Sequence, residues 1–144
     1  MKKTSVPLVI AFTPDYFIPA ATCLYSIITS MQAEGELHVI CLLSEELPER
    51  LKLKIQLIGE GRTCYSFVNL QGKLQHIYID QKYTEAASYR LLLPDLLPEY
   101  KKVIYIDCDI IVRNDLVQLY HSIDLGMNYL AAVFEASMDF QLDH

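Results

Sequence analysis

The sequence has few glycines, few basic residues, no closely spaced cysteines and no long apolar run, and each shortage excludes a class of function. Its five glycines form neither a Gly-x-Gly-x-x-Gly fingerprint nor a P-loop, so the two common glycine-rich phosphate cradles are missing. Lysine and arginine total 12 against 18 acidic residues, and no basic run exceeds two residues. We therefore expect no nucleic-acid partner, because phosphate backbones are bound through clustered basic side chains.

The cysteines and the apolar runs bear on where the protein is located. Cys23, Cys41, Cys64 and Cys108 show no Cys-x-x-Cys spacing, which is typical of reduced thiols in a cytoplasmic protein. No apolar run approaches the roughly 18 residues that a membrane span needs, so we expect no transmembrane segment. The apolar stretch at residues 7–12 is short and lacks a convincing cleavage site, so we expect no export signal.

The composition is that of a folded domain. The chain has 144 residues, of which 52% are hydrophobic and 21% charged, and this suits one domain with a substantial core. The mean hydropathy of +0.20 is high for a soluble domain of this size. One explanation is that another part of the parent protein covers some of the surface.

Strand and helix patterns alternate along the chain. Apolar or alternating runs predict strands at residues 6–12, 37–43, 63–70, 77–79, 103–106, 110–112 and 129–134. Apolar residues at helical spacing predict helices at about 19–30, 48–58, 84–97 with a break or kink at Pro94, and 116–120. This order predicts an α/β fold with a mostly parallel sheet flanked by helices, in which ligands bind outside the carboxyl ends of the strands.

Two carboxylates follow the strand predicted at 103–106, whose β-branched run is typical of a strand buried on both faces. If the extended backbone continues, Asp107 and Asp109 point to one side, where they repel each other unless a cation lies between them. Mn²⁺ and Mg²⁺ prefer oxygen ligands and often share them with phosphate, so a metal-bridged diphosphate is the natural hypothesis. The alternative is a solvated acidic turn.

Two other features lie near the predicted crevice. The turn Thr13-Pro14-Asp15-Tyr16 follows the first strand, so one crevice could hold a base near this turn and a metal-bound diphosphate near Asp107. Arg90 has mostly apolar neighbours at helical spacing. Its guanidinium either covers apolar surface and reaches water or contacts a fixed anion.

Three stretches together resemble glycosyltransferase family 8. They are Ala-Ser-Tyr-Arg-Leu-Leu-Leu-Pro-Asp-Leu-Leu-Pro at 87–98, Lys-Val-Ile-Tyr-Ile-Asp-Cys-Asp-Ile-Ile-Val at 102–112, and the opening at 9–16. The resemblance covers nearly the whole chain. It implies a Rossmann-like GT-A fold and a retaining, metal-dependent enzyme that uses UDP-sugars, in a family that includes bacterial lipopolysaccharide galactosyl- and glucosyltransferases and glycogenin-like proteins.

Carried over by position, the resemblance also implies site roles. Asp107 and Asp109 would bind Mn²⁺ (or Mg²⁺), Tyr16 would stack on uracil, and Arg90 would contact the nucleotide-sugar. The remaining implied nucleotide-sugar contacts are Ala11, Phe12, Thr13, Asp15 and Cys108, and the implied acceptor or sugar contact is Glu135. Thr13 stands where many relatives have an aspartate that bonds uracil, and Asp15 could substitute for it.

The chain is shorter than the family pattern. Relatives continue further and supply a late histidine that completes the metal site, together with the residues that hold the acceptor and the transferred sugar. We therefore expect residues 1–144 to be the nucleotide-sugar-binding N-terminal part, with the C-terminal part and the main catalytic residues absent. Such a part should bind nucleotide weakly, transfer negligibly and self-associate. The full-length protein would be cytoplasmic or peripheral to a membrane and would act on a glycan or lipopolysaccharide.

Two other functions are open. Haloacid-dehalogenase-like phosphatases also have an apolar strand followed by Asp-x-Asp, but they place it near the N-terminus, with Thr or Val two residues after the second Asp, where Ile111 stands here. A phosphatase assay separates that class. The third possibility is a non-catalytic nucleotide-sugar-binding module, which metal-dependent binding without turnover would favour.

Overall fold

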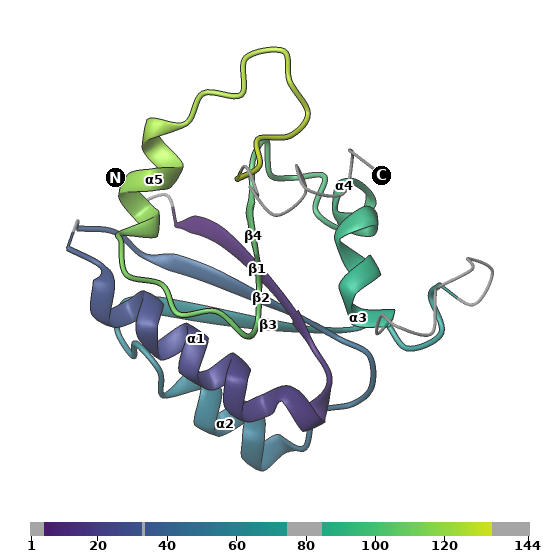
Figure 1. Cartoon of the computed structure of the whole chain (residues 1–144). Coiled ribbons are helices and arrows are strands. Elements are labelled where there is room, and N and C mark those ends of the chain that lie inside the picture. The colour runs from purple at the N-terminus through teal and green to yellow at the C-terminus, as the bar shows by residue number, and fades with distance from the viewer. Residues whose placement is uncertain (1–4, 33, 75–84, 134–144) are drawn as a thin grey trace, which may run out of the picture.

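A computed structural model describes residues 5–32, 34–74 and 85–133 (Figure 1). The strands are β1 (Val6–Phe12), β2 (Leu37–Leu43), β3 (Thr63–Asn69) and β4 (Ile104–Asp107). The helices are η1 (Pro14–Tyr16), α1 (Phe17–Ser30), α2 (Glu49–Gln56), α3 (Glu85–Ser88), η2 (Tyr89–Leu92), α4 (Leu93–Leu96) and α5 (Leu116–Ser122), where η marks a 3₁₀ helix. None of these described helices is long and apolar enough to cross a bilayer.

The four strands form one parallel sheet in the order β3-β2-β1-β4. In its register Phe12 lies opposite Leu43 of β2, and Ala11 lies opposite Asp107 of β4. Helices α1 and α2 cover one face, and α3 and α4 lie on the other (Figure 1). The predicted α/β fold, with a parallel sheet flanked by helices, is confirmed.

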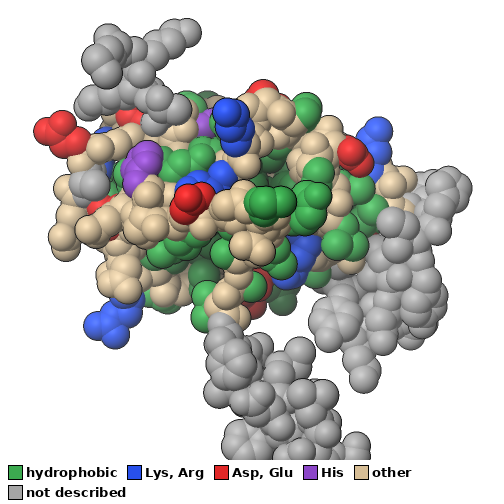
Figure 2. Space-filling view, turned by 90° about the horizontal axis from the view of Figure 1, so that it is seen from above, with side chains coloured by type: hydrophobic (Ala, Val, Ile, Leu, Met, Phe, Trp, Pro, Cys, Tyr) green, Lys and Arg blue, Asp and Glu red, His purple; other side chains and the backbone are tan. Residues whose placement is uncertain are grey.

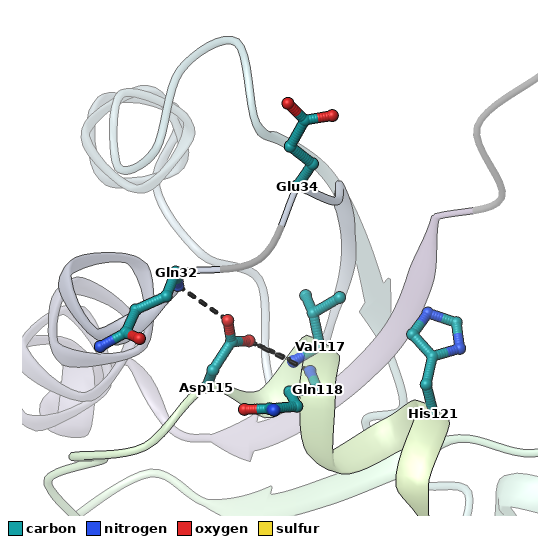
Figure 3. Close-up of a pocket in the computed structure, with 6 residues that line it drawn as sticks. All are labelled: Gln32, Glu34, Asp115, Val117, Gln118 and His121. Carbon is teal, nitrogen blue, oxygen red and sulfur yellow. Dashed lines mark hydrogen bonds between the residues drawn. The ribbon is translucent and has the colours of Figure 1, made fainter.

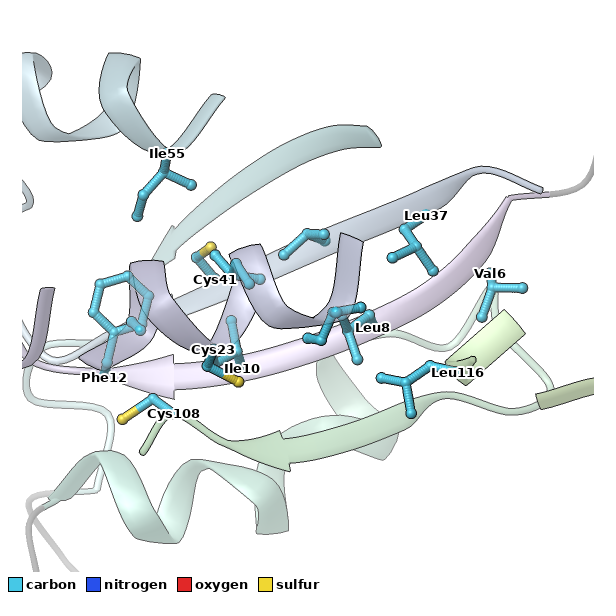
Figure 4. Packing of buried hydrophobic residues seen from close by; sticks show 14 of the residues in the cluster. Val6, Leu8, Ile10, Phe12, Cys23, Leu37, Cys41, Ile55, Cys108 and Leu116 are labelled. Carbon is cyan, nitrogen blue, oxygen red and sulfur yellow. The ribbon is translucent and has the colours of Figure 1, made fainter. Parts of the chain in front are cut away.

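β1 is the most buried strand because its alternate side chains enter two different cores. Leu8, Ile10 and Phe12 pack on the α1 and α2 side, together with Ile55 of α2 (Figure 4). Val9 and Ala11 pack on the other side against a cluster that includes Tyr89 of η2. Each of these β1 side chains is at most 6% exposed, which is typical of a central parallel strand.

The prediction that the strand after Val103 is buried on both faces is wrong. The first three residues of β4 are only half-buried, and Asp107 is exposed. The physical reason is position in the sheet: β4 pairs with β1 along one edge, and no other described strand pairs with its second edge. An apolar composition shows that a segment forms a strand, but the neighbouring elements decide how deeply it is buried.

Two further predicted strands are absent from the described residues. Residues 110–112 form none, because the N–H and C=O of Val112 bond to hydroxyls of α1 and not to a neighbouring strand. Residues 129–133 form none either, and Met127, Tyr129 and Val133 are almost fully exposed. The strand predicted at 77–79, the first residue of the helix predicted at 84–97 and the last residue of the strand predicted at 129–134 lie outside the described residues.

The predicted break at Pro94 is observed. The segment from Glu85 to Leu96 consists of three short helices, α3, η2 and α4, and Pro94 occupies the first turn of α4. Proline lacks the N–H that an interior helical residue donates, but the first turn does not need that N–H.

Apolar side chains also reach the outer surface of the molecule. A space-filling view shows them between charged groups on the face seen from above (Figure 2). Exposed large apolar side chains are most frequent in residues 110–133, which we call the last described segment. Those in this segment are Ile110, Ile111, Leu119, Met127, Tyr129, Leu130 and Val133.

Candidate functional site

The candidate site lies at the carboxyl ends of β1 and β4, where the direction of the sheet connections reverses. From β1 the chain passes through α1 to β2 on one side, while β4 joins on the other side. Open α/β sheets bind ligands in the crevice at such a switch point. Because Ala11 is paired with Asp107, the residues that follow each of them lie at the same edge of the sheet.

The β1 side of this crevice contains the predicted nucleotide residues. Ala11 and Phe12 are 6% and 1% exposed, so their side chains belong to the core. Asp15 lies on the surface in η1, and Tyr16 keeps 46% of its surface exposed. Thr13 is half-buried directly before η1.

The β4 side contains the acidic pair, on a turn. The strand ends at Asp107, and Cys108 and Asp109 form a turn, so the extended backbone that would have placed both carboxylates on one side does not continue. Both aspartates are nevertheless exposed, while Cys108 is 9% exposed and packs in the core under α1 (Figure 4). Burial, with the Asp109 charge as a second cause, raises the pKa of the Cys108 thiol.

Arg90 contacts a fixed anion, and that anion is Asp107. Its Nη2 donates to Asp107 Oδ1 at 3.4 Å, and its Nε donates to the Ala87 carbonyl at 2.8 Å. The guanidinium also lies 5.0 Å from the ring centroid of Tyr105. Burial raises the pKa of the Tyr105 phenol, and the Arg90 charge offsets part of this rise. A cation from η2 and an acid from the end of β4 are therefore in direct contact beside the acidic turn.

Helix α1 supports the acidic turn from the core side. The Cys23 thiol donates to the Asp107 carbonyl at 3.8 Å, and the Ser26 hydroxyl accepts from the Val112 N–H at 2.9 Å. Burial is the main cause that raises the pKa of Cys23 to about 11, so at neutral pH this thiol is protonated and can donate. The only sequence signal for these contacts is a pair of small polar residues on the buried face of a helix.

The carboxylates of Asp107 and Asp109 could supply some, but not all, of the ligands of a hard divalent cation. Asp107 and Asp109 offer exposed oxygen ligands, the type that Mn²⁺ and Mg²⁺ prefer. Over the described ranges, no cluster of three or more His, Cys, Asp or Glu side chains could hold a metal. The two aspartates would thus supply part of a coordination shell, as Mg²⁺ sites that include phosphate and water commonly do. Glu135 lies outside the described residues.

A separate hollow beside α5 has a structural explanation. Gln32, Glu34, Asp115, Val117, Gln118 and His121 line it (Figure 3). Asp115 caps α5 by accepting from the Val117 N–H at 2.8 Å, and it also accepts from the Gln32 N–H at 2.7 Å. This hollow lies beside the chain that enters β2, at the opposite end of the sheet from the acidic turn.

Comparisons with known proteins agree with this geometry. The model of the family described as glycosyl transferase family 8 matches residues 7–143. General stress protein A of Bacillus subtilis (strain 168) is 25% identical over 146 residues, which cover 99% of this chain and 51% of that protein. The chain therefore spans about half the length of that curated relative, and it spans less of the other curated relatives that it matches.

Two solved structures share the fold. The bifunctional glycosyltransferase WbbM, in its apo form, superposes with a TM-score of 0.81 and 25% identity, covering 94% of this chain and 24% of that chain. The galactosyltransferase LgtC, solved with donor and acceptor sugar analogues, gives a TM-score of 0.75 and 22% identity, covering 94% of this chain and 49% of that chain. These matches confirm the predicted GT-A type of fold and do not favour the phosphatase alternative. Because the family model matches almost from end to end, the chain belongs to glycosyl transferase family 8.

Proposed function

We propose that the parent protein is a retaining glycosyltransferase that transfers a hexose from a UDP-sugar to a glycan or lipopolysaccharide acceptor, and that residues 1–144 form its nucleotide-sugar-binding part. The observation that carries the proposal is the pairing of Ala11 with Asp107. It places the exposed ring of Tyr16 and the carboxylates of Asp107 and Asp109 at one edge of the sheet.

In this proposal each wall of the crevice recognises one part of the donor. Tyr16 stacks on uracil, and Thr13 with Asp15 bonds its polar edge. The backbones of Ala11, Phe12 and Cys108 line the nucleoside. Glu135 faces the sugar or the acceptor.

The acidic turn and Arg90 handle the diphosphate. Asp107 and Asp109 hold Mn²⁺ or Mg²⁺, which when bound supplies Lewis-acid neutralisation of the departing diphosphate. Arg90 donates to a phosphate or sugar oxygen as a second positive group, and its pairing with Asp107 keeps it at the same edge. These roles are electrostatic and need no side chain to transfer a proton.

Isolated residues 1–144 should bind nucleotide weakly and transfer sugar negligibly, because within the described part the metal shell has only two carboxylates. The full-length protein would work in the cytoplasm of a bacterium, free or at a membrane surface. Nucleic acid is not a partner in this proposal, since the net charge is −6.

The test is calorimetric titration of UDP into the chain with and without Mn²⁺, on the wild type and on Asp109→Asn. We expect heat of binding only when both the metal and Asp109 are present. Asp95→Asn is the matched control, because Asp95 is an exposed acid in α4, away from the turn. Binding that is equal in Asp109→Asn and the wild type would contradict the proposal.

A second assay separates enzyme from binding module. The full-length protein is incubated with UDP-hexoses and Mn²⁺, and released UDP is measured with and without added glycan acceptors. Acceptor-dependent release supports the transferase, whereas tight metal-dependent binding without any release favours a non-catalytic module. Hydrolysis of a simple phosphate ester would restore the phosphatase alternative.

A further inference from the structure

Helix α1 presents three polar side chains to the backbone that carries the acidic pair. Cys23, Ser26 and Ser30 are spaced three and four residues apart, so they share one face of the helix. Cys23 and Ser26 are buried, and Ser30 is half-buried. We refer to these three residues as the α1 row.

The first member of the α1 row contacts the start of the acidic turn. The Cys23 sulfur donates to the Asp107 carbonyl at 3.8 Å. This bond holds the backbone directly before Cys108 and Asp109. No described strand pairs with the chain after Asp107, so this contact supports the turn where the sheet pairing ends.

The other two members hold the chain as it leaves the turn. Ser26 Oγ accepts from the Val112 N–H at 2.9 Å and donates to the Cys23 carbonyl at 2.7 Å. Ser30 Oγ donates to the Val112 carbonyl at 2.9 Å. Both polar backbone groups of Val112, three residues after Asp109, are thus satisfied by α1.

Hydroxyls elsewhere on α1 behave differently. Thr22 donates to the carbonyl of Ile18, and Thr29 donates to the carbonyls of Tyr25 and Ser26, so these bonds stay within the helix. Such local bonds are the ordinary behaviour of Ser and Thr in helices. Ser26 makes one such local bond, to the Cys23 carbonyl, but Ser26 and Ser30 also bond a residue more than 80 positions away in the sequence.

A pair of metal ligands binds tightly only if the backbone holds them within about 0.5 Å of the geometry that the cation needs. We propose that the α1 row positions Asp107 and Asp109 for the divalent cation, with Ser26 as a positioning residue that does not itself contact the metal. This inference rests on the proposed function, because it assumes that the pair binds a cation.

The experiment is a Mn²⁺ titration followed by the electron paramagnetic resonance signal of free Mn²⁺. Ser26→Ala should weaken Mn²⁺ binding about fivefold, and Ser30→Ala about twofold to fivefold, because each removes a hydrogen bond of typical strength from the support of the turn. The matched control is Thr22→Ala, which removes an exposed hydroxyl of the same helix and should leave the Mn²⁺ affinity within about twofold of the wild type.

A conservative variant distinguishes positioning from general loosening. Ser26→Thr keeps the hydroxyl and should restore most of the affinity. If Ser26→Ala does not fold, the Mn²⁺ affinities of Ser30→Ala and Ser26→Thr are compared with that of the wild type instead.

The outcomes separate the two proposals. Wild-type binding of Mn²⁺ with unchanged affinity in Ser26→Ala and Ser30→Ala, even if their thermal midpoints fall, overturns the positioning role alone. A wild-type chain that binds neither Mn²⁺ nor Mn²⁺-UDP overturns the proposed function and the positioning role together.

Discussion

Asp107 contributes little to the stability of the fold, although it stands at the centre of the candidate site. Its only ion pair in the described part of the chain is with Arg90 at 3.4 Å, and the two side chains are 57% and 48% exposed. Solvent screens such a pair, and exposed pairs of this kind contribute at most about 1 kcal/mol.

We therefore expect Asp107→Asn to lower the free energy of unfolding by less than about 1 kcal/mol while abolishing Mn²⁺-dependent binding of UDP. Urea denaturation and calorimetry measure the two effects on the same sample. A loss of several kcal/mol would instead show that this carboxylate supports the fold. That result would contradict the prediction that Asp107 serves binding and contributes little to stability.

At the scale of elements, the turn between α2 and β3 depends on a glycine that has a left-handed backbone conformation and has no room for a side chain. Gly59 has a φ of +73°, and a Cβ there would lie 2.8 Å from Ile28 Cδ1 and 2.9 Å from Thr63 Cγ2. Gly61 has a φ of +85° but nothing within 4 Å of its Cβ position. The two glycines therefore separate backbone strain from crowding.

Gly61→Ala should cost roughly 1–2 kcal/mol of folding free energy, from the left-handed backbone alone. Gly59→Ala should cost about 1–3 kcal/mol more, because α1 and β3 must also move apart to admit the methyl group. Urea denaturation of the two variants gives the difference directly. Equal losses would mean that the packing of Ile28 against this turn adjusts freely.

The elements that could be predicted from the sequence are those in which burial alone explains the pattern of apolar residues. β1 and β2 have the expected bounds because each is a nearly continuous apolar run, which is typical of a strand buried on both faces. Residues 110–112 have the same composition, yet their backbone partners are hydroxyls of a distant helix. Local composition cannot reveal such a partner, and the same is true of the position of β4 at the edge of the described sheet.

The candidate site was predictable to a similar degree. The rule that ligands bind at carboxyl ends of parallel strands was enough to bring the Thr13–Tyr16 turn and Asp107 together. The pairing of Arg90 with Asp107 was one of two open options, since a guanidinium among apolar neighbours has more than one stable arrangement. The support by α1 was not predictable, because serine in a helix usually bonds its own helix.

At the scale of the whole molecule, burial raises the pKa values of several thiols and phenols, and this determines the response of stability to alkaline pH. Burial raises the pKa of Cys23 to about 11 from an ordinary value of 9.0, and it raises the pKa values of Tyr65 and Tyr89 to about 12 from 10.0. Burial also raises the pKa of Cys41. Above pH 9 the unfolded chain therefore releases protons that the folded chain retains.

The stability that these groups contribute is fully present below pH 9 and is lost as the pH rises through their folded values. We expect the urea midpoint to be level between pH 7 and 8 and to fall from about pH 9 to 12. Cys23→Ala should show a smaller fall between pH 9 and 11 than the wild type. A midpoint that stays level up to pH 11 would contradict the buried, neutral state of these groups.

The exposed apolar side chains in the last described segment lead to a prediction about association. Met127, Tyr129, Leu130 and Val133 are each at least 77% exposed. Clusters of this kind commonly mark contact surfaces. We propose that isolated residues 1–144 self-associate through this segment. Light scattering should show a mass that rises with concentration, less so in Tyr129→Ser. A constant monomer mass at high concentration would contradict the proposal.

The strand order has a consequence for the chain as it leaves the ribosome. Of the described strands β1 is synthesised first, and the edge that does not pair with β2 has no described partner until residues 104–107 have been synthesised. A long apolar strand with an open edge is a template for pairing with other chains. The open edge of β1 is therefore exposed to such pairing until β4 docks. Because Asp107 is the last residue of β4, the event that ends this hazard also brings the two walls of the crevice together.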